Sequence, residues 1–146
     1  LQHTMKTIFI QPDIHSYHID SGRHVSNIVY IKWMEVGRLK MLEQVGMPVH
    51  KLEALGVAPA LTHTEIDYKK PLYLGDRVRV ELHLSELRKI SGKIRFTFYR
   101  DEDEVVAKGE QEAVFFNLET KRPYRLSAEQ RERFTPYLAS DVSQPA

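Results

Sequence analysis

Apolar residues recur at helical spacing over residues 28–45, in steps of three with one five-residue step across Gly37 and Arg38. This spacing predicts a helix with one buried stripe, which Val29, Val36 and Met41 widen. The predicted stripe consists of Ile28, Ile31, Met34, Leu39, Leu42 and Val45.

Capping residues set the expected ends of this helix. Ser26 or Asn27 can accept a hydrogen bond from an unpaired backbone N–H at the start, and Gly46 followed by Pro48 marks the end. The helix would then have about 19 residues and a length of roughly 28 Å. A glycine inside a helix costs about 1 kcal/mol relative to alanine, so we expect Gly37 to permit close approach of another backbone.

Strict alternation of apolar and polar residues predicts strands in the second half of the chain. Residues 77–85 and 93–99 alternate in this way, and residues 105–118 supply a last long strand. The expected turns are Gly75-Asp76, Ser91-Gly92 and the acidic stretch 101–104.

Shorter elements complete the pattern. Residues 6–11 and 57–67 are β-prone, residues 49–56 resemble one or two helical turns, and Ser127 begins a short helix that ends near Phe134. One early strand, a long helix and four further strands predict an α+β fold, in which a curled antiparallel sheet of about five strands wraps around one long central helix. We expect a single domain over residues 1–146, with residues 1–4 as a remnant of expression and a loose tail from Ala139.

Composition narrows the range of partners. The 21 Lys and Arg residues nearly balance the 20 acidic residues, so the overall charge gives no reason to expect a nucleic acid or an anionic membrane as partner. The absence of cysteine excludes disulfides, a cysteine nucleophile and thiolate metal sites, and it fits a reducing compartment. With no long apolar run and no signal-like start, we expect a cytoplasmic protein.

The loop ahead of the long helix carries the most suggestive chemistry. Asp20 is followed by Ser21, Gly22, Arg23 and His24, just before a helix N-terminus, where unpaired N–H groups favour negative charge such as a developing oxyanion. A carboxylate beside an oxyanion site fits hydrolysis. The local pattern by itself favours the alternative that Asp20 forms an Asx-turn or a distal helix cap.

Three sequence motifs follow one another along the chain. Residues 20–30 read DSGRHVSNIVY and are followed by Trp33-Met34-Glu35 and Arg38, residues 65–76 read EIDYKKPLYLGD, and residues 116–123 read FNLETKRP. Together with the order of elements, they resemble the hot-dog-fold acyl-CoA thioesterases of the 4-hydroxybenzoyl-CoA thioesterase type over roughly residues 6–138. Arg23 stands where that family has glycine, and Ser26 where it has the first of two asparagines, so a different turn of the loop is open.

The resemblance implies hydrolysis of an acyl-CoA ester to the free acid and CoA. It assigns Asp20 as nucleophile or general base and the Asn27 backbone amide as oxyanion donor, without a metal or a cofactor apart from the CoA of the substrate. His24 is a further candidate, against the alternative of a structural role. Glu35 is a reserve catalytic residue, although Glu35 and Arg38 most simply form an i,i+3 pair. The histidines show no compact metal-ligand spacing.

A CoA ester carries phosphates and needs a basic rim to its site. The first candidate rim is at the turn that contains Arg88, Lys89, Ser91, Gly92 and Lys93. Weaker candidates are Lys121, Arg122 and Arg125, and then Lys69 and Lys70.

The expected assembly and the competing functions also follow from the resemblance. Family members pair their sheets edge to edge with the active site between subunits, which implies a homodimer or homotetramer. The alternatives are a non-catalytic module that binds acyl-CoA or an acyl carrier protein, which Arg23 keeps open, and a hot-dog hydratase or dehydratase. The acyl group itself cannot be deduced from the sequence.

Overall fold

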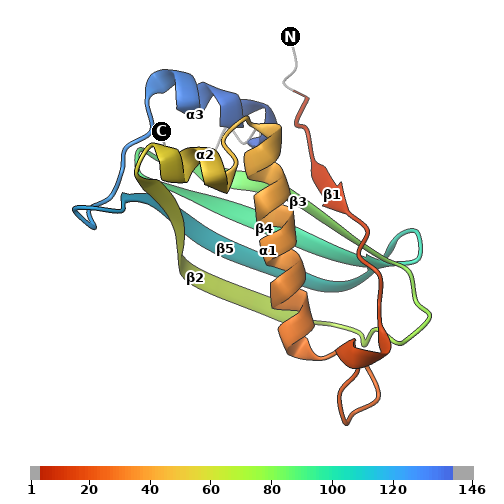
Figure 1. Ribbon diagram of the computed structural model, residues 1–146. Coiled ribbons are helices and arrows are strands. Elements are labelled where there is room, and N and C mark those ends of the chain that lie inside the picture. The colour runs from red at the N-terminus through yellow and green to blue at the C-terminus, as the bar shows by residue number, and fades with distance from the viewer. Residues whose placement is uncertain (1–3, 140–146) are drawn as a thin grey trace.

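The computed structural model describes residues 4–139, which form one antiparallel sheet with three α-helices and two short 3₁₀ helices (Figure 1). The expected remnant (apart from Thr4) and the tail beyond Ala139 lie outside the described residues. The sheet has the strand order β1-β3-β4-β5-β2. The strands are β1 (Ile8–Ile10), β2 (Val57–Tyr68), β3 (Val78–Leu87), β4 (Ser91–Arg100) and β5 (Glu104–Asn117). The helices are α1 (Asn27–Gln44), α2 (Val49–Ala54) and α3 (Ala128–Phe134), with 3₁₀ helices at Ser16–His18 and Thr135–Tyr137.

The sheet follows the alternation predicted from the sequence. Val80 of β3 pairs with Phe98 of β4, which pairs with Ala107 of β5, and all three side chains are fully buried. One expected turn is displaced, because β4 already begins at Ser91 and the β3-β4 connection consists of Arg88, Lys89 and Ile90. The Arg88 N–H closes this turn on the Ser91 carbonyl at 2.7 Å.

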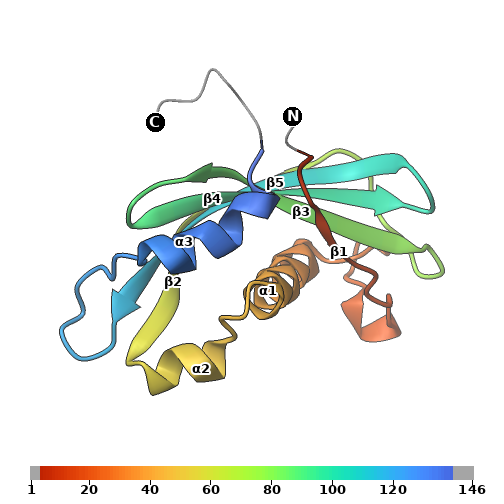
Figure 2. The ribbon, with the colours of Figure 1, turned by 90° about the horizontal axis from the view of Figure 1, so that it is seen from above.

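Helices α1 and α2 lie on the same side of the sheet (Figure 2). Helix α1 has 18 residues, and the Ser26 side chain caps its start by accepting from the Ile28 N–H at 3.4 Å. The predicted face is partly wrong. Ile28, Ile31 and Leu39 are 63%, 43% and 41% exposed, and the buried face consists of Val29, Tyr30, Trp33, Met34, Gly37, Met41 and Leu42.

Two glycines allow the helix to approach the sheet closely. A Cβ on Gly37 would lie 3.1 Å from Leu82 Cδ2 of β3, so the close partner is a side chain and not the backbone that we expected. A Cβ on Gly109 of β5 would lie 2.9 Å from Met34 Cε and 3.2 Å from the Glu65 carbonyl oxygen. Met34 therefore occupies space that any other residue at position 109 would fill.

Helix α3 closes the end of the sheet near the β3-β4 turn. Ser127 and Gln130 form the predicted capping box, in which the Ser127 hydroxyl accepts from the Gln130 N–H at 3.1 Å and Gln130 Oε1 accepts from the Ser127 N–H at 2.9 Å. Arg131 donates to the Leu87 carbonyl of β3 at 2.7 Å, and Phe134 is buried in the core. The helix is thus fixed to the sheet by the Arg131 hydrogen bond and by the buried Phe134 side chain.

Candidate functional site

The Asp20 loop is pinned to two neighbouring segments. The Val25 N–H donates to the Leu72 carbonyl at 2.8 Å, and the Ser26 N–H donates to the His18 carbonyl at 2.9 Å. Within the loop, the Asp20 N–H donates to the His24 carbonyl at 3.1 Å. These bonds give the segment before α1 a defined conformation.

Asp20 itself is exposed, and its side chain closes its own turn. Asp20 Oδ1 accepts from the Gly22 N–H at 2.8 Å, which is the Asx-turn that the sequence left open as an alternative. An Asx-turn uses one of the several acceptor positions of a carboxylate and leaves the others free for a proton or a carbonyl carbon.

Arg23 supplies the turn that a glycine would otherwise make. Its φ of 65° lies in the left-handed region that favours glycine. The substitution at this position therefore does not prevent a left-handed turn between Asp20 and His24.

His24 lies beside Asp20 across Gly22. A Cβ at Gly22 would lie 3.1 Å from both Asp20 Oδ1 and His24 Nε2, so only glycine leaves both side chains in place. The other ring nitrogen, Nδ1, is 3.4 Å from the Val25 carbonyl oxygen. The imidazole is half-buried and next to the carboxylate, and within residues 4–139 the two side chains form no hydrogen bond with each other.

The backbone amide of Asn27 is at the first turn of α1. Within the described part of the chain, the Asn27 N–H has no acceptor, whereas the Asn27 carbonyl accepts from the Tyr68 hydroxyl at 3.1 Å. Tyr68 also packs edge-on against Tyr30, with ring centroids 5.0 Å apart. Burial, chiefly, raises the pKa of Tyr30 to about 12. The start of the helix is held by β2 while one N–H stays available.

A pocket of about 360 Å³ lies between the second half of α1, the start of β2, the β3-β4 turn and α3. Among the predicted site residues, Glu35, Arg88, Ser91 and Gly92 line it, and Asp20, His24, Asn27, Lys89 and Lys93 do not. Most of its wall is apolar. The apolar lining residues are Leu39, Met41, Leu42, Val49, Ala58, Pro59, Ala60, Leu61, Leu84, Leu87, Ile90, Ile94, Ala113, Val114, Phe115, Leu126 and Phe134.

Arg38 also lines this pocket, and its partner differs from the predicted one. Arg38 Nη1 donates to Gln111 Oε1 at 2.6 Å, and no Glu35–Arg38 ion pair within 4.0 Å is present in residues 4–139. Gln111 Nε2 donates in turn to the Thr64 hydroxyl at 3.2 Å. The expected i,i+3 pair is wrong because the guanidinium points toward the sheet, where a buried amide competes with the solvated carboxylate.

This chain of contacts also settles which face of β2 meets the helix. Thr64 lies on the α1 side, so His63 and Glu65 lie on the opposite face, where they form an exposed pair at 2.9 Å. Nothing in the sequence sets Gln111 apart, because it lies between two other polar residues of β5, Glu110 and Glu112, yet it is fully buried.

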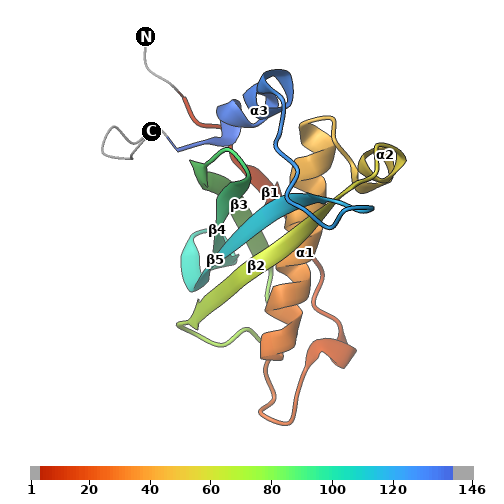
Figure 3. The same cartoon turned by 90° about the vertical axis from the view of Figure 1, so that its left-hand side faces the viewer.

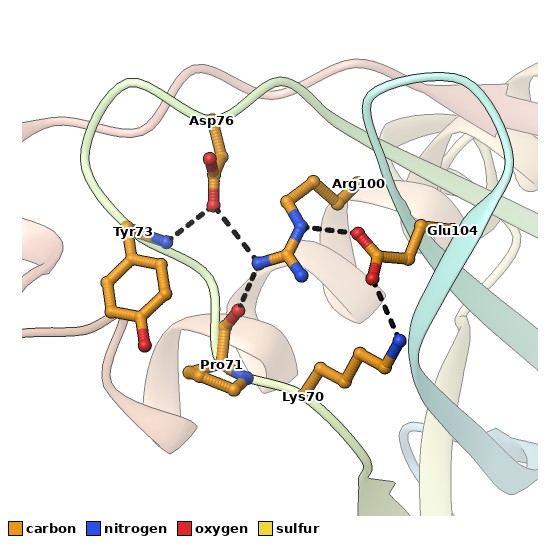
Figure 4. A network of polar contacts seen from close by, with 6 residues as sticks. All are labelled: Lys70, Pro71, Tyr73, Asp76, Arg100 and Glu104. Atoms are coloured by element: carbon orange, nitrogen blue, oxygen red, sulfur yellow. Dashed lines mark hydrogen bonds and ion pairs between the residues drawn. The ribbon is translucent and has the colours of Figure 1, made fainter.

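A polar network fixes the loop that receives Val25 (Figure 4). Arg100 donates to Glu104 Oε1 at 2.7 Å and to the Pro71 carbonyl at 2.7 Å, and it lies 3.5 Å from Asp76 Oδ2. Lys70 pairs with Glu104 Oε2 at 2.9 Å. Leu72, the acceptor for Val25, directly follows Pro71, so the network supports the Asp20 loop from behind.

The remaining basic residues are distributed over the surface. Arg88 pairs with Glu86 at 3.0 Å at the pocket, whereas Lys121 lies over the Phe116 ring at 6.0 Å. No group of three His, Asp or Glu residues in the described chain has a geometry that could hold a metal ion. No described helix is both long and apolar enough to cross a membrane.

Comparison with known proteins decides the family. The model of the thioesterase-like superfamily matches residues 14–134, which is well over half of the chain. The chain belongs to this superfamily. Membership makes it a thioester hydrolase with the hot-dog fold, and the family and enzyme class predicted from the three motifs are confirmed.

Individual relatives agree with this assignment. The long-chain acyl-CoA thioesterase FadM of Escherichia coli is 27% identical over 124 residues, which cover 84% of this chain and 93% of FadM. A thioesterase of Thermus thermophilus, solved with coenzyme A and Zn, is 28% identical with a TM-score of 0.73 and coverages of 87% and 90%. The DHNA-CoA thioesterase of Staphylococcus aureus superposes with a TM-score of 0.82 at 18% identity, over 88% and 89% of the two chains, and supports the fold alone.

Proposed function

We propose that this thioesterase hydrolyses acyl-CoA esters to the free acid and CoA. The observation that carries the proposal is the position of Arg88, Ser91 and Gly92 on the rim of the apolar pocket. A cavity suited to an acyl group thus shares residues with a basic turn suited to phosphates. The CoA moiety belongs to the substrate, and no further cofactor takes part.

In the proposed mechanism, Asp20 activates water or attacks the carbonyl carbon itself. As general base, the carboxylate takes a proton from water while the water oxygen bonds to the carbonyl carbon, and the C–S bond then breaks to release the CoA thiolate, which is protonated. As nucleophile, it forms a mixed anhydride that water hydrolyses. The Asn27 N–H donates to the developing oxyanion in either route.

Two copies of the chain would complete the site. Strand β2 is at the edge of the sheet (Figure 3), and residues 61–65 are exposed there. On α1, the exposed side chains of Ile28, Ile31 and Leu39 form an apolar face. We propose that β2 pairs antiparallel with β2 of a second copy, giving at least a dimer.

This pairing explains why Asp20 and the pocket are separate in one chain. Self-pairing around residues 61–65 would place Tyr68 of one copy beside Ala58 and Pro59 of the other. Tyr68 is bonded to Asn27, and Ala58 and Pro59 line the pocket. The first turn of α1 from one copy would therefore face the pocket of the second copy.

Glu35 is a second candidate for the catalytic carboxylate, because it lines the pocket within the same chain. The two carboxylates can be separated by a panel of acyl-CoA esters and a thiol-detecting reagent, applied to the native protein and to Asp20→Asn and Glu35→Gln. Asp13→Asn, an exposed aspartate in the preceding segment, is the matched control.

We expect thiol release from the native protein and from Asp13→Asn, and at least a 100-fold lower rate from Asp20→Asn. Equal release by Asp20→Asn, with loss in Glu35→Gln, would transfer the catalytic role to Glu35. Binding of the esters without thiol release by any of the proteins would indicate a binding module, and hydration of an enoyl-CoA without thiol release would indicate a hydratase.

A further inference from the structure

Arg38 stands out among the residues that line the pocket. Among the described residues, the other charged side chains that do so are Glu35, which is exposed, and Arg88, which pairs with Glu86 at 3.0 Å. Arg38 is half-buried, and no carboxylate within residues 4–139 lies within 4.0 Å of it. A cation is thus part of a mostly apolar wall without a close ion pair among the described residues, and the Glu35 carboxylate acts on it only from a longer distance.

The guanidinium is held in one orientation. Gln111 is fully buried, and its Nε2 donates to Thr64, so its Oε1 is left to accept from Arg38 at 2.6 Å. This neutral amide engages one of the five N–H donors of Arg38. The remaining donors are fixed in space without losing further side-chain entropy when they bind a ligand.

The register of the sheet locates Arg38 within the pocket. Gln111 pairs with Ile94, and Ala113 pairs with Gly92 one step along the same face of β5. Ile94, Gly92 and Ala113 all line the pocket. Arg38 therefore lies at the Gln111 end of the pocket floor, and Arg88 and Ser91 lie at the opposite end, by the β3-β4 turn.

A partly desolvated cation interacts more strongly with an anion or a polar oxygen than a solvated one does. An unsubstituted alkyl chain offers no such acceptor. Resting on the proposed thioesterase function, we infer that the acyl group carries an acceptor oxygen, a carboxylate or a hydroxyl, and that Arg38 binds this oxygen and determines substrate specificity. Burial, chiefly, lowers the pKa of Arg38, in agreement with a wall that withdraws it from water.

The competing role for Arg38 is a structural cross-link between α1 and the sheet. The two roles differ in one measurable quantity, the ratio of kcat/KM for matched substrates. A cross-link affects every substrate alike, whereas a binding group affects only those esters that carry the oxygen.

The test uses unsubstituted, ω-hydroxy and ω-carboxy acyl-CoA esters of four to ten carbons, with the native protein and with Arg38→Met and Arg38→Lys. For at least one chain length, we expect the native protein to prefer an oxygen-bearing ester by tenfold or more. Arg38→Met should remove this preference, so that the ratio of kcat/KM between oxygen-bearing and unsubstituted esters of the same length falls to about one. Arg38→Lys should restore part of it for the carboxylate. The acceptor is identified by the series, ω-hydroxy or ω-carboxy, whose kcat/KM falls in Arg38→Met.

Gln111→Glu is a second variant that keeps the packing. Its carboxylate would pair with Arg38 from within the protein, so we expect it to lower the preference for ω-carboxy esters without removing hydrolysis of the unsubstituted ones. A native protein without preference at any length, or an equal ratio in native protein and Arg38→Met, would overturn the inference. The inference would also be overturned if Arg38→Met changed the oligomeric state and left the ratio of kcat/KM unchanged.

A binding measurement separates this inference from the proposed function. Thioether analogues of the three CoA series cannot be hydrolysed, and calorimetry gives their Kd for the native protein and for Arg38→Met. Selective binding that Arg38→Met removes, without hydrolysis of any ester, would refute the proposed function and leave the role of Arg38 standing. Hydrolysis of the esters without selective binding would support the proposed function and refute the role of Arg38.

Discussion

The Tyr68 hydroxyl donates a 3.1 Å hydrogen bond to the Asn27 carbonyl and so connects the end of the edge strand β2 to the first turn of α1. The proposed site requires these two elements to keep their positions relative to each other. One is the strand that would pair with a second copy, and the other carries the unbonded Asn27 N–H.

Tyr68→Phe tests this connection. The variant keeps the ring contact with Tyr30 but loses the hydrogen bond, so we expect a cost of about 1 kcal/mol in the free energy of unfolding. The rate of thioester hydrolysis should fall severalfold more than this small loss of stability explains. Chemical denaturation and kcat give the two quantities. Tyr17→Phe is the control, because the Tyr17 side chain is 77% exposed, and an equal fall in kcat there would contradict the prediction.

Arg23→Gly should stabilise the protein. A left-handed residue other than glycine costs about 1–2 kcal/mol, and the greater chain entropy of glycine offsets about half of the gain. We expect an increase of about 0.5–1 kcal/mol in the free energy of unfolding, with hydrolysis unchanged. Lys121 has a φ of 62°, so Lys121→Gly should also raise the free energy of unfolding. Arg125 lies outside the left-handed region, so Arg125→Gly should lower it. Similar losses in all three variants would show that the Arg23 turn carries no strain.

The two glycines at the helix–sheet contact should respond differently to alanine. At Gly109, a methyl group would meet Met34 and the Glu65 carbonyl oxygen, and we expect a loss of about 1–3 kcal/mol. At Gly37, it meets the movable end of Leu82, and the gain of about 1 kcal/mol in helix propensity compensates. Urea unfolding of both variants makes the comparison. A larger loss for Gly37→Ala than for Gly109→Ala would refute it.

The network around Glu104 should give a pH dependence below pH 5. Hydrogen bonds from Arg100 and then from Lys70 lower the pKa of the Glu104 carboxyl from its ordinary 4.5 to about 2. Because the folded-state pKa lies below the unfolded value, the contribution is present above pH 4.5 and is lost as the pH falls toward 2.

Thermal unfolding of the native protein and of Glu104→Gln between pH 6 and pH 2 measures this contribution. The native protein should have the higher Tm at pH 6, and the difference should shrink toward pH 2. Asp103→Asn in the same hairpin is the control and should show no such trend, since Asp103 forms no ion pair within the described residues. A constant difference for Glu104→Gln would mean that the pairing does not lower the pKa.

The strands could be predicted from the sequence because their signals are local. Gly75 takes the left-handed conformation expected of the turn at Gly75-Asp76, and the alternation at Val80 and Phe98 reports burial directly. The two ends of α1 could likewise be predicted, from Ser26 at its start and Gly46 after its end. Each of these features depends on residues close together in the chain.

The buried face of α1 could not be read in this way. Apolar residues surround this helix on nearly all sides, so spacing alone does not distinguish Ile28 and Ile31, which are exposed, from Tyr30 and Trp33, which are buried. The partner of Arg38 was missed for a related reason. The i,i+3 rule considers only neighbours on the helix, and Gln111 lies 73 residues away in sequence.

The chemical reading of Asp20 was only partly accessible. The residues around Asp20 predicted an Asx-turn and a catalytic role as alternatives, and the structure contains the Asx-turn at Gly22. The pocket was missed because its wall joins Ala58, Phe115 and Phe134, three segments that only the fold brings together.

Helix α3 forms one wall of the pocket through Phe134, whereas Asp20 and the start of α1 come from the first thirty residues. A wall that limits the space for a bound acyl group and the loop proposed to break the thioester bond thus lie far apart in the sequence. Insertions or substitutions in helix α3 can therefore alter the choice of acyl group and leave the Asp20 loop unchanged. Such separation offers evolution, or an engineer, a direct route to new selectivity.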